Sequence, residues 1–421
     1  MSLCLLPRVM VVLCSLVSMA SAADWSQFRG PDTAGVSTES GVPTTWTATE
    51  NLAWKINLPG PGTSSPVFHG QQILITCYSG YNVPGADMGE PADLRRHLIA
   101  LDRKTGELRW NTPLQPALPE QDRIRDGHGY ASSTPVVDDH RIYCFFGKSG
   151  IFAFDHQGKQ LWQADVGDGL HGWGSAASPV LFDDLLIVNA SVESESVIAF
   201  DAASGKERWR VRKIRETWTT PVVVANPAGE PELIVAMQGK VLGLDPQTGQ
   251  ERWTCANDIT WYIVPSIVEE GGVIYGLGGR SGVASFAIRT GGRGDVTASH
   301  RLWTAKKGSN VSSPVLHEGR LYFMNDSSGI AYCLDAKTGD IVYEARVPRA
   351  DQIYASTLLV NDRLYYVGRS GRTFVVAAKP KFELLATNDL DDRSLFHASP
   401  VATDGRLFLR SDKALYCLEQ K

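Results

Sequence analysis

Aromatic side chains stand at repeated positions in this chain, shortly ahead of a recurrent step of small residues and proline. An aromatic residue lies three to six residues before most of these steps or their counterparts, and turns within the same units carry lysine or arginine. Aromatic rings and cations on one surface could bind a flat or anionic partner by stacking and charge-assisted hydrogen bonds. The candidate binding residues are Tyr130, Trp173, Trp218, Trp261, Tyr262, Tyr354, Phe396, His397, Lys148, Lys240, Arg280 and Arg369.

The same residues have a purely structural interpretation. Aromatic side chains at the start of inner strands could plug a central channel, and lysine and arginine side chains could simply cover a solvated rim. Large-to-small substitutions would separate the two, because a buried plug contributes to stability and a binding residue contributes mainly to affinity. Both interpretations stay open at this point.

No assembled catalytic set is recognisable in the sequence. The nine histidines form no H-x-H or H-E-x-x-H motif, and no nucleophile elbow, phosphate-binding loop or dinucleotide fingerprint occurs. Asn325 and Asp326 are the best pair for ion or proton chemistry, although Asn-Asp is also ordinary in turns. We therefore expect no catalytic residue and no metal site.

A segment of about 43 residues recurs through the chain, and it determines which elements position these side chains. Its last part reads L-D-x-x-T-G-x-x-x-W, and repeats of this period are typical of propellers and solenoids. It occurs at 101–110, 200–209, 244–253 and 334–343, with a shorter version at 154–162. The units open at Pro66, Pro135, Pro179, Pro221, Pro265, Pro314 and Pro400, with Thr357 where a further opening is due.

Each unit contains four short apolar stretches separated by turn residues, as in SSPVLHE, GRLYFMN, GIAYCLD and DIVYEAR from Ser312 onward. Four-stranded antiparallel units around an axis are propeller blades, so the openings predict an all-β, eight-bladed β-propeller. The last unit ends after three strands, and we expect the N-terminal strand around Trp54 to complete it and close the ring. The recurrent tryptophans are predicted to pack between blades: Trp54, Trp110, Trp162, Trp209, Trp253 and Trp303.

Strand order determines which loops share a face of the propeller. The links between successive blades and those between the second and third strands emerge on one side, and all other turns emerge on the opposite side. Two long insertions, 79–97 and 113–129, fall on the first side together with the aromatic series and the basic turns, which also include Arg372 and Lys413. We predict that this face, around the channel mouth, binds a protein partner or a small anionic or aromatic ligand.

The N-terminus predicts export. It contains one arginine, an apolar run and an Ala20-Ser21-Ala22 exit, so we expect cleavage near Ala22 and a periplasmic or secreted monomer. The net charge of −5 gives no reason to expect a nucleic-acid partner, and no later segment has the roughly 20 apolar residues of a membrane span. The expected organisation is a signal peptide at 1–22, a leader at 23–43 and the propeller at 44–421.

The tandem L/F-D-x-x-T/S-G-x-x-x-W units resemble the tryptophan-docked blades of the quinoprotein dehydrogenases, which use pyrroloquinoline quinone (PQQ). They are equally similar to the PQQ-like propellers without cofactor, which include the lipoprotein subunit of the outer-membrane β-barrel assembly machine. The resemblance covers residues 44–421. The opening DWSQFRGPDTAGVS (24–37) is similar to the leader of secreted PQQ-like propeller proteins.

The resemblance implies two alternative functions. The cofactor-free propellers imply a non-catalytic binding or scaffold protein of the cell envelope, with no cofactor. The dehydrogenases imply a PQQ-dependent alcohol or sugar oxidoreductase, in which two adjacent cysteines stack on the quinone and a set of acid and amide residues, with a catalytic aspartate, binds calcium. The cysteines here are widely spaced and predicted to be separate buried thiols, and the calcium set cannot be placed on this sequence, so the first function is our leading hypothesis. The cysteines left after cleavage are Cys77, Cys144, Cys255, Cys333 and Cys417.

Overall fold

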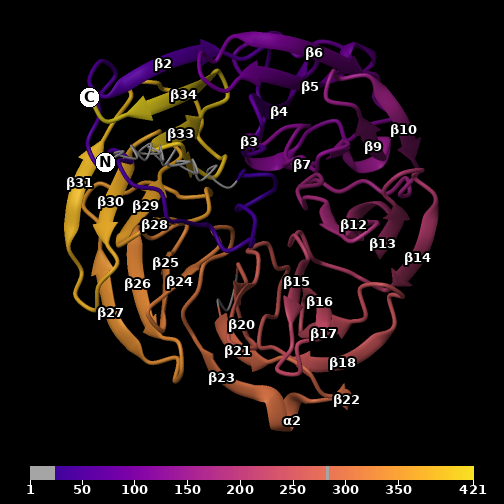
Figure 1. Cartoon of the computed structure of the whole chain (residues 1–421), viewed down its shortest axis with the longest axis vertical. Coiled ribbons are helices and arrows are strands. Elements are labelled where there is room, and N and C mark those ends of the chain that lie inside the picture. The colour runs from indigo at the N-terminus through magenta and orange to yellow at the C-terminus, as the bar shows by residue number, and fades with distance from the viewer. Residues whose placement is uncertain (1–23, 281–283) are drawn as a thin grey trace, which may run out of the picture.

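The computed structural model describes residues 24–280 and 284–421, which form eight sheets around a central axis (Figure 1). Each sheet is built on four antiparallel strands, with the first strand at the channel and the fourth on the rim. The predicted all-β, eight-bladed propeller is therefore confirmed. The predicted signal peptide, residues 1–22, lies outside the described residues.

The strands of each blade follow one another in the sequence, with one exception in blade 8. Blade 1 contains β3 (Val67–His69), β4 (Gln72–Ser79), β5 (Arg95–Asp102) and β6 (Leu108–Leu114). Blade 2 contains β7 (Val136–Val137), β8 (Ile142–Phe145), β9 (Ile151–Phe154) and β10 (Gln160–Ala164). Blade 3 contains β11 (Val180–Phe182), β12 (Leu185–Ala190), β13 (Ser196–Asp201) and β14 (Glu207–Arg212). Blade 4 contains β15 (Val222–Ala225), β16 (Pro231–Met237), β17 (Lys240–Leu244) and β18 (Glu251–Ala256).

Blade 5 contains β19 (Val268–Glu270), β20 (Val273–Gly278), β21 (Ala284–Arg289) and β23 (Arg301–Ala305). Blade 6 contains β24 (Val315–His317), β25 (Arg320–Met324), β26 (Ile330–Asp335) and β27 (Ile341–Arg346). Blade 7 contains β28 (Leu358–Val360), β29 (Arg363–Val367), β30 (Thr373–Ala377) and β31 (Leu384–Asn388). Blade 8 contains β32 (Val401–Thr403), β33 (Arg406–Arg410), β34 (Ala414–Glu419) and β2 (Leu52–Asn57).

Short elements outside this pattern extend two blades. β1 (Val36–Ser37) pairs in parallel with β28 on the inner side of blade 7, and β22 (Gly294–Asp295) pairs in parallel with β18 on the outer side of blade 4. The helices of the described chain have three or four residues each: η1 (Pro91–Asp93), η2 (Arg125–Gly127), η3 (Gly147–Ser149), α1 (Ser191–Ser194) and α2 (Thr297–His300).

Blade 8 joins the two ends of the described chain. β2 completes its sheet by antiparallel pairing with β34, with Trp54 opposite Cys417 and Ile56 opposite Leu415. The predicted closure of the ring by the N-terminal strand around Trp54 is confirmed. Because one blade is shared between both ends of the chain, the ring has none of the open edges that a linear array of blades would leave.

Strand burial follows the position of the strand in its blade. Middle strands are sandwiched between neighbouring blades, so β12 is buried on both faces, whereas the rim strand β2 exposes every second residue. The apolar clusters accordingly span two blades each. One of them joins Tyr143 and Phe145 of blade 2 to Leu186 and Phe200 of blade 3.

Five of the six recurrent tryptophans contact the next blade through one hydrogen bond each. The indole Nε1 donates to a main-chain carbonyl in the D-x-x-T-G turn of that blade, or in its shorter form. The pairs are Trp54–Lys104 (2.9 Å), Trp110–His156 (3.2 Å), Trp162–Ala202 (3.2 Å), Trp209–Pro246 (3.1 Å) and Trp303–Ala336 (2.9 Å).

Trp253 differs because the third-to-fourth strand connection of blade 5 lacks this turn. Its fully buried indole donates to Glu232 Oε2 of its own blade (2.8 Å). The same oxygen accepts a hydrogen bond from the Gly291 N–H of blade 5 (3.0 Å). The hydrogen-bonded link from Trp253 to blade 5 therefore runs through a carboxylate instead of directly from the indole to a turn carbonyl.

The glycine of each D-x-x-T-G turn lies against the docked indole. In blade 4, Gly249 has a φ of +73°, and a Cβ at this position would lie 2.7 Å from an atom of the Trp209 ring. The left-handed φ disfavours residues with a Cβ, and the indole leaves no room for one. Glycine is thus required for two separate reasons.

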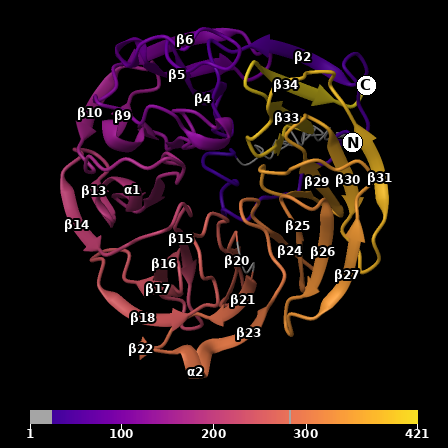
Figure 2. The ribbon, with the colours of Figure 1, turned by 180° about the vertical axis from the view of Figure 1, so that it is seen from behind.

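The leader crosses the floor of the central channel before the chain reaches β2 (Figures 1 and 2). Val137 of blade 2 donates its N–H to the Ser26 carbonyl (3.0 Å), and Arg29 Nη2 donates to the Pro314 carbonyl of blade 6, on the opposite side of the ring. β1 then adds to blade 7. Since Val137 ends its inner strand, the leader closes the channel at the end opposite to the face with the insertions.

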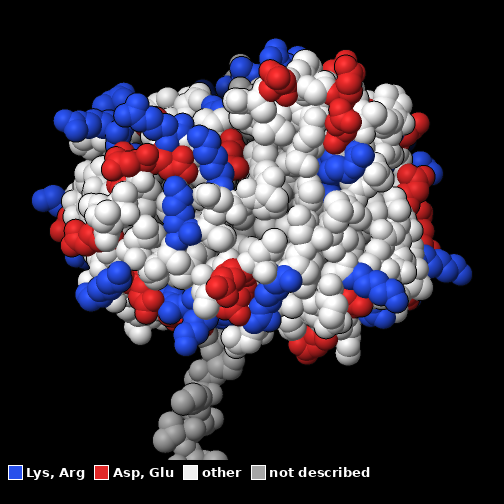
Figure 3. Space-filling view, turned by 90° about the horizontal axis from the view of Figure 1, so that it is seen from above, with Lys and Arg blue, Asp and Glu red and all other residues white. Residues whose placement is uncertain are grey.

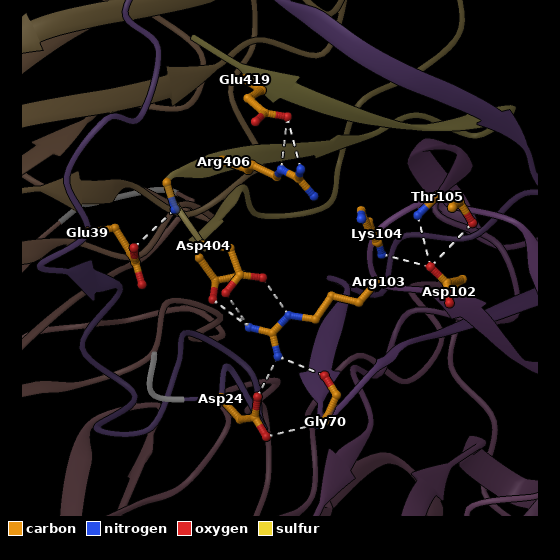
Figure 4. A network of polar contacts seen from close by, with 12 residues as sticks. Asp24, Glu39, Gly70, Asp102, Arg103, Lys104, Thr105, Asp404, Arg406 and Glu419 are labelled. Atoms are coloured by element: carbon orange, nitrogen blue, oxygen red, sulfur yellow. Dashed lines mark hydrogen bonds and ion pairs between the residues drawn. The ribbon is translucent and has the colours of Figure 1, made fainter. Parts of the chain in front are cut away.

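Arg103 binds the leader to both blades of the closing seam (Figure 4). Its Nη1 donates to Asp24 Oδ1 in the leader (2.6 Å) and to the Gly70 carbonyl of blade 1 (3.0 Å). Its Nε and Nη2 donate to the two carboxylate oxygens of Asp404 in blade 8 (2.6 and 3.0 Å). One buried guanidinium therefore holds three segments that are far apart in the sequence.

The repeat spacing needs one correction in blade 5. Inner strands begin directly after the opening proline, as β3 does after Pro66, but β19 begins at Val268. The counterpart of the opening proline is therefore Ile267, and Pro265 stands two residues ahead of it. The predicted opening at Pro265 is therefore wrong by two residues, because blade 5 has Ile267 where the other blades have the opening proline or Thr357.

Replacing Gly249 by alanine should destabilise the protein more than the same change at Gly239 in the same blade. Both glycines have a left-handed φ (+73° and +76°), but a Cβ at Gly239 meets no atom within 4 Å. Gly239→Ala should cost about 1–2 kcal/mol from backbone strain, and Gly249→Ala about 1–3 kcal/mol more from overpacking against Trp209. Chemical denaturation measures both, and equal losses would contradict the importance of indole docking.

Candidate binding site at the mouth of the central channel

The central channel contains a cavity of about 480 Å³. Its walls come from the beginnings of inner strands, from the links that precede them, from the turns between the second and third strands of blades 5 and 6, and from Phe28 of the leader. Because the leader crosses one end of the channel, the cavity opens on the face that carries the insertions, which we call the mouth face. This volume is typical of small-molecule sites.

The lower part of the cavity is a ring of eight hydroxyl groups, one from each blade. At seven of the eight junctions, the hydroxyl accepts a hydrogen bond of 2.9–3.4 Å from the main-chain N–H of its counterpart in the preceding blade. Between blades 4 and 5, the Trp218 N–H instead donates to the Ile263 carbonyl (2.8 Å). The ring residues are Ser65, Thr134, Ser178, Thr220, Ser266, Ser313, Ser356 and Ser399.

Trp173, Trp218 and Tyr262 form an aromatic wall beside this exceptional junction. The Tyr262 ring centroid lies 5.4 Å from that of Trp218 and 6.1 Å from that of Trp173. Trp218 is buried, and its Nε1 donates to the Gly174 carbonyl (2.7 Å). The Arg280 guanidinium lies 5.6 Å from the Trp173 ring centroid, which is a cation–π geometry.

The opposite wall contains Tyr354 and His397 with Arg369 behind them. Arg369 donates from Nε to His397 Nε2 (2.8 Å) and from Nη1 to Gln352 Oε1 (2.6 Å), and its guanidinium lies 4.5 Å from the Tyr354 ring centroid. An arginine can only donate, so His397 Nε2 accepts and its neutral ring carries the proton on Nδ1. Burial, followed by the charges of Arg369 and His128, lowers the pKa of His397 to about 3.

The pair Asn325–Asp326 reaches the cavity, but most of its polar atoms are already bonded. Asp326 Oδ1 accepts the Asn310 N–H (2.8 Å), and burial raises the pKa of its carboxyl. The Asn325 amide donates to the Gly308 carbonyl (3.0 Å) and accepts from Ser328 N–H (3.0 Å). Asn325 therefore stabilises its own turn, and Asp326 contributes the cavity's single carboxylate among the described lining residues.

These donors do not fit the calcium and quinone site that the dehydrogenase resemblance implies. A calcium site needs six to eight oxygen ligands, and beside the Asp326 carboxylate the lining offers the Asn325 amide, which is already bonded, and one unpartnered amide oxygen, Asn310 Oδ1. The described cysteines are free, buried in separate blades and absent from the described cavity lining. Across residues 24–280 and 284–421, no group of three or more His, Cys, Asp or Glu side chains is placed to hold a metal ion.

The two insertions pack together over blades 1 and 2. The Tyr81 hydroxyl of the first donates to the Asp122 carbonyl of the second (2.9 Å), and both contribute to one buried apolar cluster that includes Tyr130. The Arg96 guanidinium of the first insertion and the Glu120 carboxylate of the second form a buried ion pair. The insertions are therefore one wall beside the mouth, held by apolar contacts and a charged pair.

The structure brings six of the twelve predicted binding residues to the cavity and places six elsewhere. Trp173, Trp218, Tyr262, Tyr354, His397 and Arg280 line it. Of the other six, Trp261 and Lys240 are exposed outside the cavity, and Tyr130 and Phe396 are buried. Lys148 donates to the Pro119 carbonyl of the second insertion (2.8 Å). Arg369 lies behind the wall that contains Tyr354 and His397.

Phe396 lies in the apolar core, so it neither lines the cavity nor plugs the channel. Its side chain is 0% exposed and packs 6.0 Å from the Tyr416 ring centroid, whereas its neighbour His397 lines the cavity. Successive side chains of an extended chain point to opposite sides, so only one of the two can face the channel. For the six lining residues, a binding role stays a prediction.

Sequence reasoning missed several lining residues and the meaning of the ring hydroxyls. Among those that also line the cavity are Phe28, His128, Asn310 and Gln352. The hydroxyls had a visible signal, because serine or threonine precedes almost every opening proline. Phe28 had none, since the leader lies outside the repeats and its position depends on contacts with distant blades.

The fold and its central cavity define a propeller of the PQQ-like type. The structure is similar to BamB from Moraxella catarrhalis, with a TM-score of 0.62, 13% identity and coverage of 88% of this chain and 97% of that one. It is also similar to the quinohemoprotein alcohol dehydrogenase from Comamonas testosteroni, with a TM-score of 0.64, 14% identity and coverage of 95% and 81%. At these identities the likeness shows the fold.

The sequence narrows this class to one family. The profile of the family described as outer membrane protein assembly factor BamB matches residues 28–166 and 95–345, more than half of the chain. The chain belongs to this family. The outer membrane protein assembly factor BamB of Burkholderia pseudomallei (strain K96243) is 26% identical over 206 residues, 47% of this chain, and the match spans about half (49%) of that relative's length. Within the described residues, no helix has the length and apolar character needed to cross a membrane.

The burial of neutral His397 should make stability depend on pH. A folded pKa of about 3 lies below the unfolded value of 6.5, so this contribution is present above pH 6.5 and is lost as the pH falls. Between pH 7.5 and 5, wild type should lose about 2 kcal/mol relative to His397→Gln.

Denaturation of both proteins across this range measures the difference. Burial raises the pKa values of Glu193 and Asp412 to about 7, so these two carboxyl groups stabilise the fold as the pH falls. Both proteins contain them, so their contribution cancels in the difference between wild type and variant. A pH-independent difference would contradict the burial of a neutral imidazole.

Proposed function

We propose that this chain is a non-catalytic binding or scaffold protein of the cell envelope, and that a protein partner docks on its mouth face. Membership of a family described as an outer membrane protein assembly factor supports the role. The cavity donors, which do not fit a calcium and quinone site, favour binding over oxidation. The observation that carries the proposal is the composition of the mouth face.

Large apolar side chains are exposed on the loops around the mouth. Met88 and Leu118, from the two insertions, are 53% and 48% exposed, and Leu170 and Trp261, from links between blades, are 40% and 49% exposed. The other large apolar side chains with such exposure in the described chain belong to rim strands, where side chains alternate. Exposed apolar groups gathered around a depression are typical of interaction sites.

The side of the rim seen in Figure 3 offers no alternative docking surface for a charged partner. In the edge-on view of Figure 3, lysine and arginine side chains lie among aspartate and glutamate side chains. Such a surface has no extended field of one sign to attract a charged partner. On the mouth face, exposed Lys240 and Arg280 accompany the aromatic groups, as in the polar rim of a protein interface.

Substituting Trp261→Ala and Lys240→Glu should abolish capture of the partner without unfolding the protein, because both side chains are exposed and lie outside the cavity. The measurement is affinity capture from envelope extracts, comparing the proteins retained by wild type and by the double variant. Lys337→Glu, an exposed charge reversal on the opposite face, is the matched control. Retention of every captured protein by the double variant would refute docking on the mouth face.

Export is the second part of the proposal. We expect the mature chain to begin near Asp24, after cleavage close to Ala22, because the N-terminal sequence has the organisation of a signal peptide. Intact-mass spectrometry of the chain purified from the envelope or medium of its own host measures the cleavage site. A full-length mass, or a lipid adduct on Cys14, would show that the processing prediction is wrong.

A further inference from the structure

We propose that the central cavity binds a neutral carbohydrate, from one to three sugar units in length. This inference rests on the proposed binding function and adds a small-molecule ligand beneath the protein-docking surface. Three properties of the lining carry it: paired donor and acceptor capacity, aromatic faces and balanced charge. A cavity of about 480 Å³ suits a ligand of this size.

The ring hydroxyls offer both donors and acceptors to the cavity. At seven junctions the oxygen accepts one main-chain N–H from the preceding blade. A hydroxyl oxygen has two lone pairs and one proton, so each group keeps a proton to donate and one lone pair. Such a group matches a sugar hydroxyl, which also donates and accepts at one atom.

Two buried polar atoms higher in the cavity have no partner within the described protein. They are His397 Nδ1 and Asn310 Oδ1, and both residues line the cavity. His397 is nine-tenths buried, and its Nδ1 carries a proton because Nε2 accepts from Arg369. The lining therefore lacks one acceptor and one donor, and a ligand with several hydroxyl groups supplies both.

The aromatic side chains provide flat surfaces for sugar rings. Trp173 is half-buried and Tyr262 and Trp218 lie beside it, while Tyr354 faces them from the opposite wall. A pyranose ring has an apolar face of C–H groups that packs on an aromatic ring, while its hydroxyl groups point outward to polar side chains. The cavity combines both surfaces.

The charges in the lining are balanced, which favours a neutral ligand over the anionic ligand expected from the sequence. Arg280 and Asp326 both line the cavity, and the Arg280 charge opposes the rise in the pKa of Asp326 that burial causes. Arg369 donates to Gln352 and His397. A phosphate or carboxylate in the cavity would be close to Asp326 without an uncompensated cation beside it.

Isothermal titration calorimetry of the full chain tests this assignment with cellotriose, maltotriose, xylotriose and N,N′-diacetylchitobiose. Citrate and inorganic phosphate are the anionic probes. We expect saturable binding of at least one sugar, and an affinity about tenfold lower in Trp173→Ala and in Asn310→Ala, with Trp173→Phe retaining most of it. Met88→Ala, an exposed change in the first insertion and outside the cavity, should leave the sugar affinity unchanged.

Several outcomes would overturn the assignment. They are the absence of saturable binding by all four sugars, binding of citrate or phosphate alone, and equal loss of affinity in Met88→Ala and Trp173→Ala. Thermal melts identify a variant that fails to fold, in which case Tyr354→Ala replaces it. Protein capture is tested at Trp261 and Lys240 and has a separate readout. A failure of sugar binding therefore leaves the docking proposal standing, and a failure of protein capture leaves the sugar proposal standing.

Discussion

The main-chain N–H groups at the inner ends of the blades impose the constraint on which the rest of the structure depends. Each blade is a separate sheet, so an N–H at the start of an inner strand has no strand to pair with in the next blade, and leaving it buried without an acceptor is costly. A serine or threonine hydroxyl of the next blade accepts it at seven of the eight junctions. These short bonds fix the spacing of the blades at the centre and place the hydroxyl ring around one cavity.

The junction between blades 4 and 5 shows what happens where this arrangement is replaced. Thr217 and Ile263 form a main-chain bridge there, and Trp253 reaches blade 5 through Glu232 instead of through a turn carbonyl. The links on both sides of this bridge carry Trp218 and Tyr262, so the aromatic wall stands where the repeat is least regular. The main-chain bridge at the centre and the altered tryptophan contact at the rim thus occur at the same junction, between blades 4 and 5.

The periodic part of this fold could be predicted from the sequence, because each D-x-x-T-G turn and its tryptophan are local signals that recur. Ring closure through Trp54 followed from a missing strand. The path of the leader could not be predicted, since Arg29 finds its acceptor at Pro314 through a contact between distant segments. At the site, spacing identified the aromatic positions but not the direction of each side chain, which is why His397 lines the cavity and Phe396 does not.

The leader also determines how the cavity relates to stability. Its residues bind blades 2, 6 and 7, and Arg103 joins it to both blades of the seam, so the floor of the cavity exists only when the ring is closed. The lining itself comes from every blade. A molecule in the cavity therefore binds the closed ring and not the open chain, and it must stabilise the ring by mass action in proportion to its affinity. Closure of the propeller and formation of its binding site are, in this architecture, one event.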